Sequence, residues 1–109
     1  MFVIQLTDLA EADIERAFIW WAKNRSLTEA KTWYKEVYRA IETLRVLPER
    51  CAVVTETKLS ISGARQIAFG IGTRPTHRII FVIKGGEVVI LRIRHHAQDS
   101  LELEDLTDQ

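Results

Sequence analysis

The side chains whose types and spacing could do chemistry are mostly arginines and histidines in the second half of the sequence. Arg78 interrupts the otherwise apolar run His77–Ile83, where a buried charge would be costly without a partner. Two adjacent imidazoles, His95 and His96, follow the run Glu87–Ile93, and imidazole exchanges protons near neutral pH. A histidine pair at the end of a strand also fits a surface or hydrogen-bonding role, so catalysis is one of two interpretations.

Other common kinds of site have no pattern in this sequence. It contains no Gly-rich phosphate loop, no spacing typical of a nucleophile triad and no His/Cys cluster with metal-ligand spacing. The single cysteine, Cys51, cannot form an internal disulfide and is interpreted as a partly buried small hydrophobe. The sequence therefore argues against NTPases, triad hydrolases and metalloenzymes, and we expect neither a metal nor another cofactor.

Charge is distributed unevenly, although the chain carries 15 basic and 15 acidic side chains. Residues 58–94 have a net charge of +6, residues 95–109 of −5 and the first 56 residues of −1. The basic residues of the middle section are Lys58, Arg65, Arg74, Arg78, Lys84, Arg92 and Arg94, opposed only by Glu87. A basic surface suits phosphates or an acidic protein, although such residues on strands are often merely solvated.

Length and composition indicate one globular domain over residues 1–109, with an acidic C-terminal tail from about residue 96 to residue 109. Hydrophobic residues make up 47% of the chain, which is enough to build a sizeable core. Charges interrupt every apolar run before the roughly 20 residues needed to cross a bilayer. Met1–Thr7 also lacks the features of a signal peptide. We therefore expect a cytoplasmic protein with no membrane partner.

Two capped helices are expected after a short N-terminal strand. Phe2–Leu6 alternates as a strand does, and Asp8, followed three residues later by a glutamate, has the pattern of a helix N-cap. A second capping box, Ser26 with Glu29, begins a longer helix whose apolar residues recur at three-and-four spacing until Pro48, which we expect to end it. The two helices should form an antiparallel hairpin that buries its tryptophans.

The second half of the sequence predicts three strands, Arg65–Phe69, His77–Ile83 and Glu87–Ile93. The last two are joined at Gly85-Gly86, a strong signal for a tight hairpin. The chain is therefore predicted to be α+β, with an N-terminal strand and a two-helix hairpin packed on an antiparallel sheet (β-α-α-β-β-β). The segment after Ala97 fits a last strand, a short helix or an extended arm.

The register of the predicted hairpin decides which charged residues share a face. If its turn has two residues, Arg78 lies opposite Ile93, and alternation assigns the faces. One face then carries Arg78 and His95, and the other carries His77, Arg92 and Arg94. A longer turn would change this assignment.

Three short segments carry a resemblance to a known family. They are Leu-Pro-Glu-Arg-Cys at 47–51, His-Arg-Ile-Ile-Phe at 77–81 and Ile-Leu-Arg-Ile-Arg-His at 90–95. With the order of the predicted elements, they resemble the RelE/ParE toxin superfamily over nearly the whole chain, and the last segment is similar to its ParE and plasmid-stabilisation branch. The resemblance implies the toxin of a type II toxin-antitoxin module, which arrests growth unless a cognate antitoxin wraps it.

The RelE-like branch implies an mRNA interferase that cuts messenger RNA on the ribosome without a metal. Such cleavage needs a base for the ribose 2′-hydroxyl, a cation for the pentacoordinate phosphorus and an acid for the leaving 5′-oxygen. By resemblance, Glu56 would be the base, Arg78 the cation and His95 or His96 the acid. Arg65 would be a second phosphate ligand.

The ParE-like branch implies inhibition of DNA gyrase by protein contact, with no catalytic step. We favour this role, because relatives that cut RNA commonly end with a tyrosine or further basic residues. Here Ala97 and an acidic tail follow instead, and the acidic tail would repel ribosomal RNA. The residues expected to contact the target are Arg65, Arg78, Arg92 and Arg94. The expected partners are the antitoxin and either gyrase or the ribosome with mRNA, and a degenerate member that arrests nothing is the third alternative.

Overall fold

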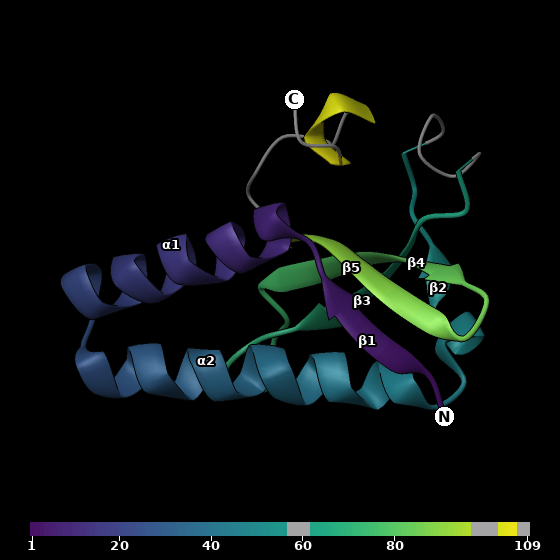
Figure 1. Ribbon diagram of the computed structural model, residues 1–109. Helices are drawn as coiled ribbons and strands as arrows, with labels where there is room; N and C mark the ends of the chain where they lie inside the picture. The colour runs from purple at the N-terminus through teal and green to yellow at the C-terminus, as the bar shows by residue number, and fades with distance from the viewer. Residues whose placement is uncertain (57–61, 97–102, 107–109) are drawn as a thin grey trace.

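A computed structural model describes residues 1–56, 62–96 and 103–106, and within them two helices pack on a five-stranded sheet (Figure 1). The helices are α1 (Asp8–Asn24) and α2 (Leu27–Glu42), with short 3-10 turns at Thr43–Arg45, Pro48–Arg50 and Leu103–Leu106. The strands are β1 (Val3–Leu6), β2 (Ala52–Val53), β3 (Arg65–Phe69), β4 (His77–Lys84) and β5 (Glu87–His95). The predicted α+β class and the predicted order of the main elements are confirmed.

The sheet is mixed, with the strand order β1-β5-β4-β3-β2. β1 runs parallel to β5, from Val3 opposite Glu87 to Leu6 opposite Ile90, so the prediction of a purely antiparallel sheet was wrong at this edge. Short turns force β3, β4 and β5 to be antiparallel, but no short connection links β1 to β5, so the sequence does not determine their relative direction. The two-residue β2, which pairs with β3, was also missed.

The N-cap of α1 is Thr7 rather than the predicted Asp8. The Thr7 hydroxyl accepts a hydrogen bond from the Ala10 amide (3.1 Å) and donates one to the Leu91 carbonyl (3.0 Å). Thr7 therefore caps the helix and ties it to β5, whereas Asp8 lies inside the first turn at the positive end of the helix dipole.

The predicted start of α2 is confirmed, but its predicted end is not. The Ser26 hydroxyl accepts a hydrogen bond from the Glu29 amide (3.0 Å), as a capping box requires. The α-helix ends at Glu42 and tightens into the 3-10 turn Thr43–Arg45, so it stops before Pro48 is reached. Pro48 instead begins the next 3-10 turn, where its missing amide costs nothing.

The main core lies between the helix hairpin and one face of the sheet (Figure 1). Trp33 and Phe81 are completely buried there. Trp20 is 53% exposed, so the expectation that the helix hairpin buries its tryptophans was wrong for this residue. We call the face that points away from the helices the open face. A smaller core on it joins Ile80 to Leu106 of the C-terminal 3-10 turn.

The β4–β5 hairpin has the predicted two-residue turn, with Lys84 opposite Glu87. A bulge then interrupts the register, because β5 holds one more residue than β4 where Leu91 lies. Arg78 is therefore opposite Arg94 instead of Ile93. The predicted faces were consequently wrong: His77 and His95 share the helix-covered face, whereas Arg78 and Arg94 share the open face.

Candidate functional site

Arg78 lies on the open face and is held by two side chains of its own chain. Its Nη1 donates hydrogen bonds to Glu56 Oε1 (3.0 Å) and to Gln66 Oε1 (2.7 Å), while Nη2 donates to the other oxygen of Glu56. The Arg78 and Glu56 side chains are only 17% and 12% exposed. The structure thus brings together two of the proposed catalytic residues, in a bidentate pair whose charges neutralise each other.

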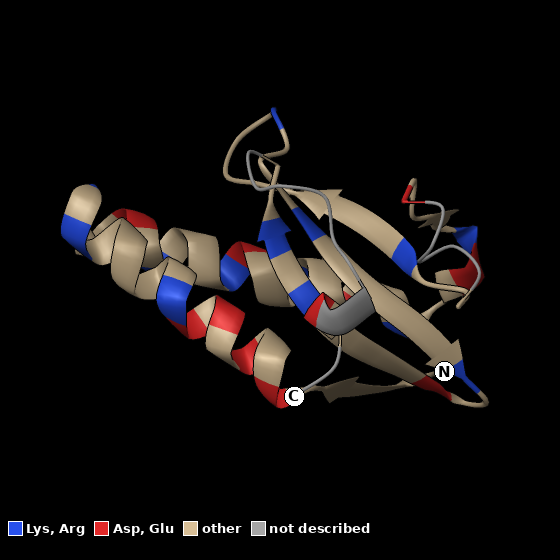
Figure 2. Ribbon diagram, turned by 90° about the horizontal axis from the view of Figure 1, so that it is seen from above, with Lys and Arg blue, Asp and Glu red and all other residues tan. Residues whose placement is uncertain are grey.

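Arg92 forms a second internal ion pair, with Asp13 of α1. Its Nε and Nη2 donate to the two carboxylate oxygens (2.7 and 3.0 Å), and its Nη1 donates to the Asp105 carbonyl (2.6 Å). Asp13 Oδ2 also accepts from the Ile93 amide (2.9 Å). The hydrogen bonds to Asp13 raise the pKa of Arg92 above its ordinary value. One guanidinium therefore links α1, β5 and the C-terminal 3-10 turn, which lies close to β5 in Figure 2.

Arg65 is likewise bound within the chain. Its Nη1 donates to the carbonyls of Cys51 (2.7 Å) and Glu49 (3.2 Å). Arg65, Arg78 and Arg92, which were predicted to contact the target, thus already have partners inside the described part of the protein. Arg94, the other arginine of that prediction, lies directly opposite Arg78. An external partner has to compete with the existing hydrogen bonds of Arg65, Arg78 and Arg92.

The histidines of the predicted site do not gather around Arg78. His95 packs edge-on against His77, with 4.9 Å between ring centroids, on the helix-covered face. The sheet therefore separates His95 from Arg78 and Glu56. His96 follows the end of β5, where its amide donates to the Thr76 carbonyl (2.8 Å) and its side chain is exposed.

His77 is a buried titratable group that the sequence did not single out. Its ring packs against Trp33 (5.3 Å between centroids) and Phe69 (5.4 Å), and its Nδ1 is 2.8 Å from the Thr76 hydroxyl. Burial, followed by the charges of His95 and His96, lowers the pKa of His77 to about 4. His77 is therefore neutral at physiological pH and belongs to an apolar cluster.

An amphipathic groove of about 580 Å³ lies where α1 passes the ends of β4 and β5. Its lining includes Asp13, Arg16, Trp20, Trp21, His77 and His95. The exposed Trp20 ring packs edge-on against Trp21, with 5.5 Å between centroids. Sequence reasoning missed this groove, although two adjacent tryptophans on a helix cannot both face the core, and one is available for a partner.

Two further observations concern only the residues that the structure describes. None of their helices is long and apolar enough to span a bilayer. They also contain no group of three or more His, Cys, Asp or Glu side chains placed to hold a metal ion.

A helix hairpin packed on one face of a mixed five-stranded sheet defines the architecture of this α+β domain. A solved structure titled "Chromosomal ParDE TA system from P. aeruginosa" has the same fold, with a TM-score of 0.72 and 19% identity. The match covers 87% of this chain and 96% of that chain. A comparison with curated proteins found no match.

The family itself follows from a sequence model. The model described as "ParE toxin of type II toxin-antitoxin system, parDE" matches residues 4–100. The chain therefore belongs to the ParE toxin family. It is the toxin of a type II toxin-antitoxin module, and its partner is a cognate antitoxin.

Proposed function

We propose that this toxin arrests growth in the cytoplasm by binding DNA gyrase, and that it has no catalytic step of its own. The observation that carries the proposal is the division of the candidate catalytic residues between two faces of the sheet. Arg78 and Glu56 neutralise each other on the open face, while His95 packs against His77 on the other face. Membership of the ParE family supports the same choice.

The internal ion pairs also suggest how such a toxin would recognise its target. A carboxylate that already neutralises a buried arginine leaves little charge for an outside partner, and breaking the pair would be costly. In this proposal, Arg78 and Arg92 hold the surface in shape, with Arg65 anchored to main-chain carbonyls. Recognition then depends on apolar contact, for which Trp20 in the α1 groove is the main candidate.

Pulse-labelling after induction of the toxin without its antitoxin tests the proposal in cells. DNA synthesis is expected to fall first, with protein synthesis following later. In a purified system, the toxin should inhibit supercoiling by gyrase and should leave mRNA on ribosomes intact. An early stop in translation, together with cut mRNA, would contradict the gyrase proposal.

Substitution of Trp20 tests the recognition surface. Because the ring is half exposed, Trp20→Ala should leave the fold intact and weaken gyrase inhibition. The matched control is Val46→Ala, which shortens a side chain of similar exposure just after the 3-10 turn Thr43–Arg45. Equal inhibition by both variants would exclude the Trp20 groove as the gyrase contact.

A ribosome-dependent ribonuclease is the second candidate, because the structure does bring Glu56 and Arg78 together. In that case, Arg78→Ala combined with His96→Ala should abolish mRNA cleavage on ribosomes. If the double variant arrests growth as strongly as the parent, these residues are not a catalytic apparatus. If the parent stops neither DNA synthesis nor translation, the chain is a degenerate member of its family.

A further inference from the structure

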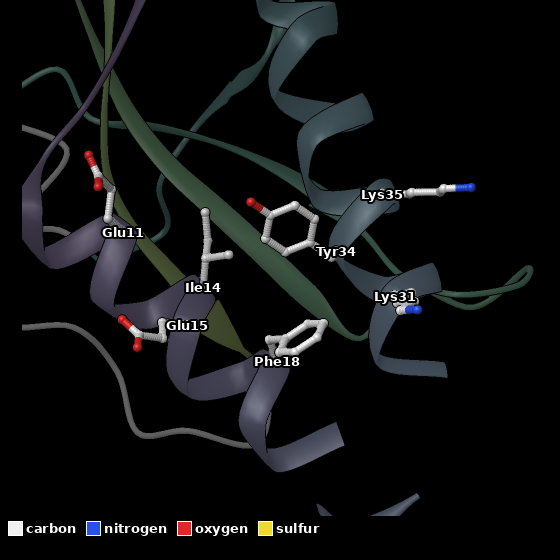
Figure 3. Close-up of a pocket in the computed structure, with 7 residues that line it drawn as sticks. All are labelled: Glu11, Ile14, Glu15, Phe18, Lys31, Tyr34 and Lys35. Atoms are coloured by element: carbon white, nitrogen blue, oxygen red, sulfur yellow. The ribbon is translucent and has the colours of Figure 1, made fainter. Parts of the chain in front are cut away.

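We propose that a second copy of this chain docks on the outer groove between α1 and α2, so that the toxin forms a symmetric dimer. This groove has a volume of about 540 Å³ and lies on the helix hairpin (Figure 3). It is separate from the groove that holds Trp20, and the two grooves share none of their lining residues.

The centre of the outer groove is apolar and aromatic. Phe18 of α1 meets Tyr34 of α2 edge-on, with 5.9 Å between ring centroids, and Ile14 lies beside them (Figure 3). Tyr34 is 45% exposed, so a large part of its ring faces solvent. Half-exposed aromatic side chains of this kind are typical anchors of protein interfaces.

Charges of opposite sign border the two sides of this centre. Glu11 and Glu15 project from α1, and Lys31 and Lys35 project from α2 (Figure 3). Each side therefore carries two like charges spaced i, i+4, an arrangement that slightly destabilises a helix. Within the described residues, none of these four side chains forms an ion pair, whereas other charged residues of the same helices, such as Asp13, do.

This charge pattern is complementary to itself. In a two-fold symmetric interface, a contact from residue i to residue j is repeated from j to i. A two-fold axis along the helix hairpin would lay α1 of each copy against α2 of the other. The acidic side of each copy then meets the basic side of its partner, and the aromatic centres meet in the middle. The net charge of zero adds no overall repulsion between copies.

The size of the helix hairpin sets the expected strength of the dimer. At 1.5 Å per residue, helices of 17 and 16 residues are about 25 Å long. With helices packed about 10 Å apart, the face covers roughly 500 Å² in projection. That is at the lower end for stable protein interfaces, so we expect micromolar association that weakens in high salt.

Charge reversal at Glu15 and Lys35 tests the dimer, because both side chains are exposed and their replacement should not disturb folding. Sedimentation of the full chain over about 1 µM to 1 mM should show a monomer–dimer equilibrium. Glu15→Lys and Lys35→Glu should each weaken it about tenfold, since either one turns two symmetric attractions into repulsions. The double variant should restore it. Arg74→Glu, in an exposed loop outside the groove, is the matched control and should change nothing.

A mixture of the two single variants gives the decisive result. In a heterodimer, the two lysines of the first copy face the two glutamates of the second, so the mixture should associate more strongly than either variant alone. The proposal would be overturned if the parent protein is a monomer at every concentration. It would also be overturned if neither charge reversal changes the dissociation constant of the dimer. If the reversals weaken binding of the cognate antitoxin but not self-association, the groove belongs to that partner and the dimer proposal fails.

Discussion

The burial of His77 should make the stability of this toxin depend on pH in a way that one substitution can test. The ring packs against Trp33, Phe69 and His95, with centroids 5.3, 5.4 and 4.9 Å away. Burial, and then the charges of His95 and His96, lower the pKa of His77 to about 4 from an ordinary value of 6.5. Replacement by phenylalanine removes the titrating group and keeps a ring of similar size.

The sign of the effect follows from which state takes up the proton. Between about pH 6.5 and about pH 4, the unfolded chain protonates this imidazole, whereas the folded protein does not. The part of the free energy of unfolding that depends on His77 is therefore at its full value above about pH 6.5, and it is lost as the pH falls toward 4. With 1.36 kcal/mol per pKa unit, the loss between pH 7 and pH 5 comes to about 2 kcal/mol.

Equilibrium urea denaturation at pH 7 and pH 5 measures this difference. The parent should lose about 2 kcal/mol more of its free energy of unfolding than His77→Phe over that interval, because the two proteins differ only in the ring at position 77. His96→Gln is the control and should keep most of the dependence, since it changes only the smallest of the three causes. Equal losses in the parent and His77→Phe would refute the assignment of a neutral, buried His77.

Four further substitutions test the contacts that hold the fold. Asp13→Ala leaves the Arg92 guanidinium buried without a carboxylate and should lower the free energy of unfolding by about 3–5 kcal/mol. Arg16→Ala, which removes the 65% exposed partner of the same aspartate, should cost about 1 kcal/mol or less in the same denaturation assay. Ser26→Ala removes the cap of α2 and should cost about 1 kcal/mol, seen as an earlier thermal midpoint by circular dichroism. Leu106→Ala should cost about 1–2 kcal/mol by denaturation, and no loss would mean that the C-terminal turn adds nothing to the second core.

The elements that sequence reasoning found are those with a local signal. The cap at Ser26, the three-and-four spacing of α2 and the glycine pair at 85–86 each lie within a few residues of the structure they determine. The features it missed depend on distant partners. The direction of β1 depends on β5, about 80 residues later in the chain. The bulge at Leu91 has no glycine or proline to mark it, and this one extra residue reversed the predicted faces.

In the candidate site, too, the contacts that sequence reasoning missed depend on partners far apart in the chain. The family resemblance assigned Arg78 and Glu56 to one candidate site but did not predict their ion pair, and nothing predicted the pairing of Arg92 with Asp13. The only available signal for the second pair was an aspartate among the apolar residues of α1, one position before Ile14. A polar residue on that side of a helix has to find a buried partner, and Arg92 supplies it.

Because of the two ion pairs, the basic middle section of the sequence forms a less basic surface than its net charge implies. Its net charge of +6 counts Arg78 and Arg92 as available cations. In the fold, their carboxylates come from outside that section, Glu56 just before it and Asp13 from α1. Folding therefore moves two negative charges onto the sheet, and the surface is less basic than the order of residues implies. A partner that relies on phosphate contacts gains little from such a surface, whereas a protein partner that uses shape and apolar contact loses nothing.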